Sequence, residues 1–382
     1  MERVSPGTIL CVNAGSSSLK AALYSFDDDG LGLLTRTNEP VAGGRYDSAL
    51  EDVLAGFADR GLPTPTAVGH RVVHGGPLYT GPVLIDSDVL DELSELVRLA
   101  PLHLPASIAG IEALAARCPG VPQVACFDTA FHRRMPEVAQ RLPLSEDLWR
   151  IGVRRYGFHG LSYEHVVASL GPVLGARAVV AHLGSGSSMA AIRDGVSVDT
   201  TMGLTPTGGL VMSTRAGDLD PGVAVYLLRE GGYDAGGLEA LLDRGSGLLA
   251  VSGSTGDMKT LLERRVSDPR AALAVEMFCT QARKHVGALA AVLGGIDTLV
   301  FTGGIGERSA VVRAEICDGL AHLGVRLDPD QNAADEAVIS GDGGSDGDGA
   351  GCTVRVVVCD EELVIARHAS ELVGRVPGAG SG

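Results

Sequence analysis

Residues Val12–Lys20 read VNAGSSSLK, a glycine and serine turn with an apolar segment on either side. The segment before the turn is Thr8–Asn13, and the segment after it is Leu19–Phe26. Short apolar runs around a glycine-rich turn are typical of two β-strands joined by a hairpin. Backbone N–H groups crowded in such a turn point towards anions, and serine hydroxyls add further donors. The stretch therefore predicts a phosphate-binding turn between two strands.

A second copy of this pattern lies near the middle of the chain. Ala178–Leu183 is an apolar run, Gly184–Ser188 is a small polar turn, and Met189–Arg193 is again mostly apolar. The first copy reads NAGSSSLKAA from Asn13, and the second reads HLGSGSSMAA from His182. Repeated strand–turn–strand units indicate an internal duplication. Two unrelated glycine–serine hairpins are the alternative.

A third glycine-rich turn is expected at Gly303–Glu307, directly after the apolar strand Thr298–Phe301. None of the three turns has the GxxxxGK[ST] pattern of a P-loop. Three such turns, two of them in duplicated hairpins, favour a nucleotide held by two related halves of the chain. Lys20, just past the first turn, is placed to reach a phosphate, although a solvated strand lysine is the alternative.

The composition predicts a globular chain of two domains that binds neither nucleic acid nor membranes. The 382 residues are 45% apolar and 20% charged. The 31 Lys and Arg against 47 Asp and Glu give a net charge of −16, which repels phosphate backbones and anionic lipid. The seven cysteines are scattered and include no CxxC pair, which favours a reducing cytoplasm. We expect neither a signal peptide nor a membrane helix.

Other strands and helices follow from hydrophobic periodicity and capping signals. Ser87 is expected to cap a helix that runs to about Ala100. Further helices are predicted from Pro105 to near Cys118 and at Ser162–Leu170, Pro221–Arg229, Leu238–Leu242, Pro269–Leu293 and Glu361–Val373. Further strands are predicted at Ala67–Val73, Gln123–Phe127, Val196–Val198 and Val354–Val358.

Several charged residues stand in surroundings that suggest a site. Arg71 lies inside an apolar strand, where a charge needs a protein or ligand partner. Arg215 lies in a loop rich in Gly, Ser and Thr, and guanidinium groups suit carboxylate and phosphate oxygens. Asp128 ends a strand and Glu361 begins a helix, so each can hold magnesium through water or cap a helix. Taken singly, the arginines are as consistent with a structural role as with a catalytic one.

Two histidines, His159 and His132, are expected to have different roles. His159 lies between Phe158 and Gly160, where it is placed to donate a hydrogen bond to an oxyanion. His132 is expected to be structural.

The chain resembles the acetate kinase family in segments that occur in the family's order across nearly its whole length. The matching segments are VNAGSSSLK (Val12–Lys20), GHRVVHGG (Gly69–Gly76), LAPLH (Leu99–His103), FDTAFH (Phe127–His132), YGFHG (Tyr156–Gly160), VDTTMGLTP (Val198–Pro206), GLVMSTRAGDLDP (Gly209–Pro221), FTGGIGE (Phe301–Glu307) and DEELVIAR (Asp360–Arg367). The combination is far more specific than any single glycine-rich turn.

The resemblance implies an α/β fold of two duplicated actin-like (ribonuclease H-like) domains with ATP in the cleft between them. Residues 1–130 plus 362–382 would form the N-terminal domain, because the C-terminal helix would return to it. Residues 131–361 would form the C-terminal, nucleotide-binding domain. The implied activity is acetate kinase, a phosphotransferase with a carboxyl acceptor: reversible, magnesium-dependent, in-line transfer from ATP to acetate, giving acetyl phosphate and ADP. A homodimer is implied as well.

The resemblance also implies roles for individual residues. The catalytic residues would be Arg71, Asp128, His159 and Arg215. The pocket for acetate would be formed by Arg71, Val73, Leu102, Phe158 and Pro206. ATP would be bound by Lys20, His182, Leu183, Gly184, Ser185, Gly186, Asp257, Met258, Lys259, Gly303, Gly304, Ile305, Gly306 and Glu307. Magnesium, with manganese as an alternative, would be held by Asn13 and Glu361. Ser185 stands where the family usually has asparagine, and Lys259 where arginine is common.

Acetate is already ionised at neutral pH, so the nucleophile needs no general base. Catalysis is then expected to consist of positioning and charge stabilisation, with Asp128 as a positioning or metal-water group. Two alternative functions stay open. A propionate or butyrate kinase differs by methylene groups, each worth only about 1–3 kcal/mol of discrimination. An ATP-gated scaffold or chaperone of the same fold is the other, but it leaves Arg71 and the Phe158–His159 turn without a purpose.

Overall fold

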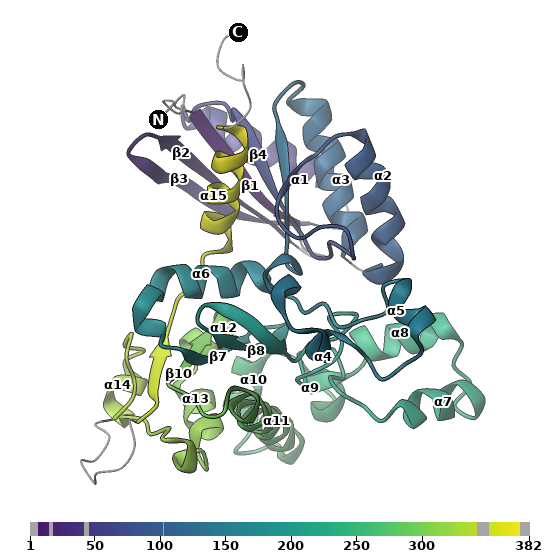
Figure 1. Cartoon of the computed structure of the whole chain (residues 1–382), viewed down its shortest axis with the longest axis vertical. Helices are drawn as coiled ribbons and strands as arrows, with labels where there is room; N and C mark the ends of the chain where they lie inside the picture. Colours follow the sequence, from purple (N-terminus) through teal and green to yellow (C-terminus); the bar gives the residue numbers. More distant parts are fainter. Residues whose placement is uncertain (1–6, 15–17, 42–45, 102, 342–350, 375–382) are drawn as a thin grey trace. The chain divides into compact units, whose positions relative to one another are not determined.

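The computed structural model describes residues 7–14, 18–41, 46–101, 103–341 and 351–374. The chain forms two compact units (Figure 1). Unit 1 comprises Met1–Arg133, Phe158–His165 and Asp360–Gly382, and unit 2 comprises Arg134–Gly157 and Val166–Cys359. The domain boundaries implied by the family resemblance stay a prediction.

Unit 1 contains a six-stranded mixed sheet in the order β3-β2-β1-β4-β6-β5. Its strands are β1 (Gly7–Ala14), β2 (Ser18–Asp27), β3 (Gly30–Pro40), β4 (Ala67–Val72), β5 (Val83–Leu84) and β6 (Gln123–Phe127). Strands β1, β2 and β3 form an antiparallel meander, whereas β4 pairs in parallel with both β1 and β6. The helices of unit 1 are α1 (Tyr46–Asp59), α2 (Ser87–Leu96), α3 (Leu104–Arg117) and α15 (Glu361–Val373). Helix α6 (Gly160–Leu170) begins in unit 1 and ends in unit 2.

Alternate residues of β1 bury opposite faces of this sheet. Leu10 and Val12 belong to a core that includes side chains of α1 and α3. Ile9 and Cys11 belong to another core, which is built with α15. The period of two in a strand thus places helices on both faces, and Figure 1 shows α15 lying across one of them. This packing returns the C-terminal helix to the N-terminal sheet.

Unit 2 contains a five-stranded sheet in the order β11-β10-β7-β8-β9. Its strands are β7 (Arg177–Leu183), β8 (Ser187–Arg193), β9 (Val196–Thr200), β10 (Thr298–Thr302) and β11 (Thr353–Val356). Its helices are α4 (Glu137–Gln140), α5 (Glu146–Arg150), α7 (Pro221–Arg229), α8 (Ala235–Arg244), α9 (Gly247–Ser252), α10 (Met258–Arg264), α11 (Pro269–Leu293), α12 (Gly303–Arg308), α13 (Ala310–Cys317) and α14 (Pro329–Ala333). The long helix α11 supplies much of the core that covers the sheet.

The two sheets share one topology. In each, three successive strands form an antiparallel meander, and the first of them pairs in parallel with a later strand that pairs in parallel with one more. The order β3-β2-β1-β4-β6 in unit 1 is therefore matched by β9-β8-β7-β10-β11 in unit 2. The predicted α/β class and the internal duplication are confirmed.

Many predicted elements are confirmed, and some residue for residue. The helices Pro221–Arg229, Pro269–Leu293 and Glu361–Val373 and the strand Gln123–Phe127 have the predicted bounds. None of the seven cysteines, which all lie among the described residues, forms a disulfide. Among the described residues, no helix is both long and apolar enough to cross a bilayer.

Two predicted details are wrong. Asp86, rather than Ser87, caps α2 by accepting a hydrogen bond from the Val89 N–H. The α-helix itself ends at Leu96, and a 3-10 helix over Val97–Leu99 continues to the predicted end near Ala100. The expected glycine-rich turn at Gly303–Glu307 is the first part of helix α12. Glycine has a low helix propensity, so contacts with the rest of unit 2 override the local preference there.

Candidate functional site

Four predicted site residues of unit 1 lie at one edge of its sheet. Asn13 lies near the end of β1, Arg71 near the end of β4, and Asp128 directly follows β6. These strands are parallel neighbours, so their carboxyl ends meet at the same edge. Glu361 begins α15, and its carboxylate reaches Arg71. The topology thus gathers residues that are far apart in the sequence.

Arg71 and Asp128 form the centre of this cluster. Nε and Nη2 of Arg71 donate to the two carboxylate oxygens of Asp128 at 3.0 and 2.7 Å. The side chain of Asp128 is 1% exposed and that of Arg71 is 18% exposed. Burial raises the pKa of Asp128 above its usual value, while the Arg71 guanidinium favours the charged form. Because both carboxylate oxygens are engaged, Asp128 orients the guanidinium of Arg71.

Asn13 and Glu361 contact the remaining nitrogen of Arg71. Nη1 of Arg71 lies 3.4 Å from Oδ1 of Asn13 and 3.4 Å from Oε2 of Glu361. Nδ2 of Asn13 donates to the same Glu361 oxygen at 3.4 Å. Amide and carboxylate oxygens are hard ligands of the kind that magnesium prefers, usually together with water. The donor set therefore fits a magnesium ion.

Asp360 determines where α15 begins, and so where Glu361 lies. Its side chain caps the helix by accepting from the Leu363 N–H at 3.0 Å. It also accepts from Nη2 of Arg36 at 2.7 Å and from the hydroxyl of Tyr24 at 3.2 Å. Strands β2 and β3 thus hold the start of the helix that carries Glu361.

His159 has an unusual backbone conformation. Its φ of 57° lies in the left-handed region, which residues with a Cβ rarely adopt. The His159 N–H donates to the Asp128 carboxylate, and the Gly160 N–H donates to the Asp128 carbonyl oxygen at 2.9 Å. A Cβ on Gly160 would lie 2.1 Å from that carbonyl oxygen, so glycine is required. Asp128 therefore holds both the guanidinium of Arg71 and the turn that carries His159.

His132 supports the same turn from within the core. Its Nε2 donates to the carbonyl oxygen of Phe158 at 3.1 Å. Burial lowers the pKa of His132 to about 4, so the ring is neutral at pH 7. The Phe158 ring is itself buried and meets the ring of His74 edge-on, with 5.4 Å between the centroids.

The residues predicted to form the acetate pocket are divided between the two units. Val73, half-buried just after β4, belongs to unit 1 together with Phe158. Leu102 lies outside the described residues. Pro206 belongs to unit 2, where its carbonyl oxygen accepts from Nη1 of Arg215 at 3.3 Å.

Unit 2 contains a cavity of about 380 Å³. Three segments that are distant in the sequence form its walls: Gly184–Ser185 after β7, Asp257–Lys259 at the start of α10, and Gly304–Ile305 in α12. Met258 and Ile305 contribute apolar surface, and Lys259 contributes a positive charge. A concave site of this size, apolar with a few polar groups, is typical of small-ligand binding. All three segments are among those that the resemblance assigns to ATP.

Next to the cavity, the start of α12 packs closely against the end of β7. Gly303 has a φ of +75°, and a Cβ there would lie 2.8 Å from the carbonyl oxygen of Leu183. The start of α12 and the end of β7 therefore touch backbone to backbone. The Gly184 N–H closes the next turn by donating to the carbonyl oxygen of Gly186 and to the hydroxyl of Ser187.

Asp257 has a local structural function as well as a place in the cavity wall. Its Oδ2 accepts from the backbone N–H and the hydroxyl of Thr260, at 2.9 and 2.6 Å, and so caps α10. These hydrogen bonds lower the pKa of Asp257 below its usual value. The group is a carboxylate at neutral pH and can accept further hydrogen bonds.

Several residues assigned to ATP by the resemblance do not line this cavity. They are His182, Leu183, Gly186, Gly303, Gly306 and Glu307 in unit 2, and Lys20 in unit 1. Lys20 is exposed on β2 and is the cross-strand partner of Asn13. The middle of the first glycine-rich turn, residues 15–17, lies outside the described residues.

Four lining residues were not predicted. They are Ser213, Leu262, Arg308 and Ser309. Leu262 follows Met258 by four positions in α10, so helical spacing could have indicated it. Arg308 and Ser309 directly follow the FTGGIGE segment and are not part of the motif.

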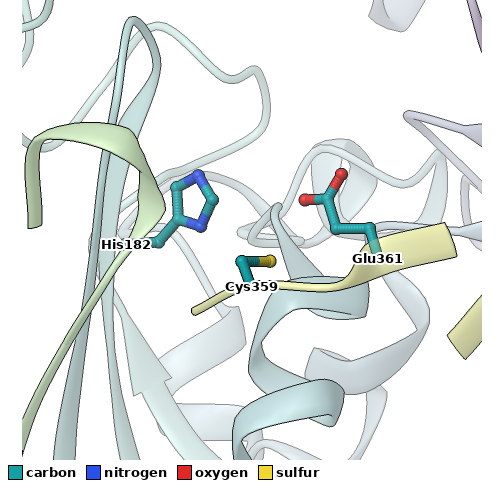
Figure 2. A group of neighbouring side chains, drawn as sticks. All are labelled: His182, Cys359 and Glu361. Carbon is teal, nitrogen blue, oxygen red and sulfur yellow. The ribbon is translucent and has the colours of Figure 1, made fainter. Parts of the chain in front are cut away.

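His182 lies near the end of β7, beside Cys359 (Figure 2). A ring nitrogen of His182 and the Cys359 sulfur lie within 4.8 Å of each other. Both residues are half-buried and belong to unit 2. Glu361, the third residue labelled in Figure 2, belongs to unit 1.

Comparison with known proteins shows the family to which the chain belongs. The family model described as the acetokinase family matches residues 8–367. An acetate kinase from Rhodopseudomonas palustris is 46% identical, over 94% of this chain and 97% of that protein. A propionate kinase structure from Francisella tularensis matches with a TM-score of 0.86 at 34% identity, over 96% of this chain and 99% of the other. An acetate kinase structure from Porphyromonas gingivalis matches with a TM-score of 0.81 at 34% identity, over 96% and 100%. Over nearly its whole length, the chain belongs to the acetokinase family.

Proposed function

We propose that the chain is an acetate kinase, which transfers the γ-phosphoryl group of ATP reversibly to acetate and releases acetyl phosphate and ADP. The observation that carries this function is the cavity of unit 2, where three separate motif segments converge on a space of nucleotide size. The family implies the use of ATP and a carboxyl acceptor. ATP as substrate and seven free cysteines fit a reducing cytoplasm, which is the compartment we propose.

The phosphoryl transfer requires positioning and charge stabilisation rather than proton transfer. Acetate is a carboxylate at neutral pH and can attack phosphorus without a base. In the proposed mechanism Arg71 and Arg215 bind carboxylate and phosphoryl oxygens, and His159 donates to the transferring group. Asp128 acts by orienting Arg71 and the His159 backbone, because both of its oxygens are already engaged. Phe158 and Val73 would contact the methyl group.

Magnesium would be held by Glu361 and by Asn13, through water where direct contact is not made. When bound, the ion would neutralise charge on the nucleotide phosphates. Lys259, Arg308 and the Asp257 carboxylate would contact the nucleotide from the walls of the unit 2 cavity. Manganese offers the same preference for oxygen ligands.

Propionate is the second candidate acceptor, because the matching structure from Francisella tularensis is described as a propionate kinase. One methylene group is worth only about 1–3 kcal/mol in an apolar pocket. A hydroxamate assay with acetate, propionate and butyrate compares their kcat/KM values directly. We expect acetate to give the highest value. A higher value for propionate would reassign the substrate, and ATP hydrolysis that ignores all three acids would overturn the proposed function.

Arg215→Ala tests the phosphoryl-transfer assignment. We expect kcat to fall by about a thousandfold or more, because a cation that stabilises the transition state is lost. Arg193→Ala is the matched control, since Arg193 only donates to the carbonyl oxygens of Val292 and Leu293. Near-normal turnover of Arg215→Ala would remove Arg215 from the mechanism.

We propose that the chain forms a homodimer through α7. No residue of this nine-residue helix is buried, although most of its side chains are apolar. Val223, Val225, Tyr226 and Leu228 are between 40% and 62% exposed. Exposed apolar side chains on one helix are typical of a protein–protein interface. A second copy is the occupant that the family resemblance implies.

Sedimentation velocity tests this interface. Tyr226→Glu should shift the chain from dimer to monomer, because it places a charge in the apolar contact. Val266→Glu is the control, since Val266 is 96% exposed but isolated from α7 in the sequence. A Tyr226→Glu chain that still sediments as a dimer would place the interface elsewhere.

A further inference from the structure

The largest fully buried side chain described in the structure is a charged one, Arg313 of α13. Its Nε donates to Oδ1 of Asn332 at 2.8 Å, and its Nη2 donates to the Asn332 carbonyl oxygen at 2.7 Å and to the Asp335 carboxylate. Its Nη1 donates to the carbonyl oxygens of Gly306 and Glu307, each at 2.9 Å. Burying a guanidinium is costly unless its hydrogen bonds are satisfied. The arrangement around Arg313 satisfies them on every nitrogen.

The two carbonyl groups that Nη1 contacts belong to the last turn of α12. Carbonyl groups at the end of a helix have no partner inside the helix, and a positive charge there complements the helix dipole. Arg313 therefore closes the C-terminal end of α12. The residues on either side of this contact, Gly304 and Ile305 before it and Arg308 after it, line the cavity of unit 2.

Glu307 fixes the other end of the same helix. Its Oε1 accepts from the Gly303 N–H at 3.0 Å and from the Cys359 N–H at 2.9 Å. The residue is only 9% exposed and does not line the cavity. Its carboxylate thus joins the first residue of α12 to the segment that follows β11. The short helix is held at its start by a carboxylate and at its end by a guanidinium.

We propose that Arg313 and Glu307 are positioning residues for the nucleotide, which hold α12 in place as one wall of the cavity without contacting the ligand. The proposal deepens the proposed function, on which it rests, by separating residues that shape the cavity from residues that line it. It reassigns Glu307, which the family resemblance places among the ATP-binding residues. It also predicts that the affinity for nucleotide depends on residues outside the cavity.

The geometry of the guanidinium is essential to this function. Nη1 reaches two carbonyl oxygens of α12 while Nε and Nη2 are engaged by α14 and the residues after it. Lysine offers one nitrogen in place of this fork, so it cannot reach all of these partners. Arg313→Lys keeps the charge and removes the bridging, which makes it the informative variant. Arg313→Met also removes the charge and is expected to fold less well.

The chain offers a matched control in Arg283. This half-buried arginine of α11 donates to the carbonyl oxygens of Glu315 and Ile316, in the last turn of α13. It therefore makes the same type of contact with the end of a neighbouring helix. No residue of α13 lines the cavity. Arg283→Lys should then reduce stability in a similar way without moving α12, which forms one wall of the cavity.

The test measures ADP binding by titration calorimetry in the wild-type chain, Arg313→Lys and Arg283→Lys, together with urea unfolding and KM for ATP and for acetate. We expect Arg313→Lys to raise the Kd for ADP and the KM for ATP about tenfold, with KM for acetate within a factor of two of the wild type. Arg283→Lys should leave the Kd for ADP unchanged. Glu307→Gln, whose amide oxygen can still accept both hydrogen bonds that Oε1 accepts, should give a smaller loss of ADP affinity than Glu307→Ala.

Wild-type ADP affinity in Arg313→Lys would overturn the proposal, as would an equal loss of affinity in Arg283→Lys. The outcome is separate from that of the proposed function. A chain that binds ADP but phosphorylates no carboxylate would contradict the proposed function. The ADP affinity of Arg313→Lys would still test the positioning role of Arg313. If the wild-type chain turns over acetate and Arg313→Lys keeps the wild-type ADP affinity, only the positioning role of Arg313 would be contradicted.

Discussion

The two sheets share one topology, yet corresponding positions in them carry different chemistry. The first strand of each meander ends at an equivalent position, and the strand registers relate the neighbouring strands of the two sheets to each other. The corresponding pairs are Asn13 and His182, Arg71 and Thr302, and Asp128 and Cys359. In unit 1 these positions form a buried ion pair with its hydrogen-bonded neighbours. In unit 2 the same positions hold a half-buried imidazole, a buried hydroxyl and a thiol.

In unit 1 this difference produces a charged cluster, whereas in unit 2 a cavity lies beside the corresponding strand end. The buried Asp128 carboxylate must be paired, and it binds Arg71, whose guanidinium also contacts Asn13 and Glu361. Thr302 is small and uncharged and needs no such partners. Backbone groups of Gly303 and Leu183 approach each other there instead, and a cavity opens beside them. The strand arrangement is the same in both units, but a charged cluster lies at the strand ends of unit 1 and a cavity lies beside those of unit 2.

The largest effect is expected from breaking the charged cluster. Asp128→Asn removes the carboxylate that orients Arg71 and holds the His159 turn. We expect kcat/KM for acetate to fall by about a thousandfold or more. The free energy of unfolding should fall by about 3 kcal/mol, because one member of a buried ion pair is left alone. The hydroxamate assay and urea unfolding measure the two changes.

The double variant Arg71→Met with Asp128→Leu separates stability from activity. It replaces the ion pair by apolar side chains and should recover most of the lost stability, with turnover still absent. If Asp128→Asn kept activity within tenfold of the wild type, the cluster would be a structural feature only.

Acidification is expected to lower the free energy of unfolding by an amount of intermediate size. Burial lowers the pKa of His70 and of His132, both in unit 1, to about 4. These histidines stay neutral in the folded chain, whereas the unfolded chain binds protons near pH 6.5. Their contribution to stability is therefore complete above pH 6.5 and is lost as the pH falls towards 4. Each should cost about 2 kcal/mol between pH 7 and pH 5.

Urea unfolding at pH 7 and pH 5 tests this dependence in the wild-type chain and in His132→Gln. The variant should lose less stability on acidification, because one of the two protonations no longer opposes folding. His322→Gln is the control, since His322 is exposed. Parallel pH curves for the wild type and His132→Gln would rule out His132 as a source of acid sensitivity.

The smallest effect is expected at Thr302, the counterpart of Arg71. Its Oγ1 is buried and has no hydrogen-bond partner among the described residues. Thr302→Val replaces that hydroxyl by a methyl group of similar shape, so stability should change by less than about 1 kcal/mol. We expect kcat/KM to stay within about threefold of the wild type. A loss like that of Asp128→Asn would mean that both halves depend equally on this strand position.

The secondary structure could be predicted where a pattern was strong, and less well elsewhere. Helix α11 has a capping aspartate, a proline at its first position and a glycine after its last residue, and its predicted bounds are confirmed. Strand β3 was missed because most of its residues are exposed and its second half is polar in sequence. Helix α1 was missed although Tyr46, Leu50, Val53 and Phe57 follow a helical period, so that signal was available.

The site could be predicted residue by residue but not as an arrangement. The motif segments at Gly184, Asp257 and Gly304 supply most of the residues that line the cavity. Leu262 and Arg308 were missed because they lie just beyond the motifs. The function of Glu307 could not be inferred, since its two backbone partners, Gly303 and Cys359, depend on how α12 meets the end of β11.

By itself the sequence determined the duplicated strand–turn–strand pattern, the family and the residue types available for chemistry. Hydrophobic periodicity and glycine spacing are local properties of the sequence, so they can be recognised without knowledge of the fold. Only the tertiary structure decided that Asp128 holds Arg71, that Arg313 holds α12, and that equivalent strand ends became a charged cluster in one unit and a cavity wall in the other. Those outcomes depend on which strand ends are brought together, because a buried charge is stable only beside a partner that the topology supplies.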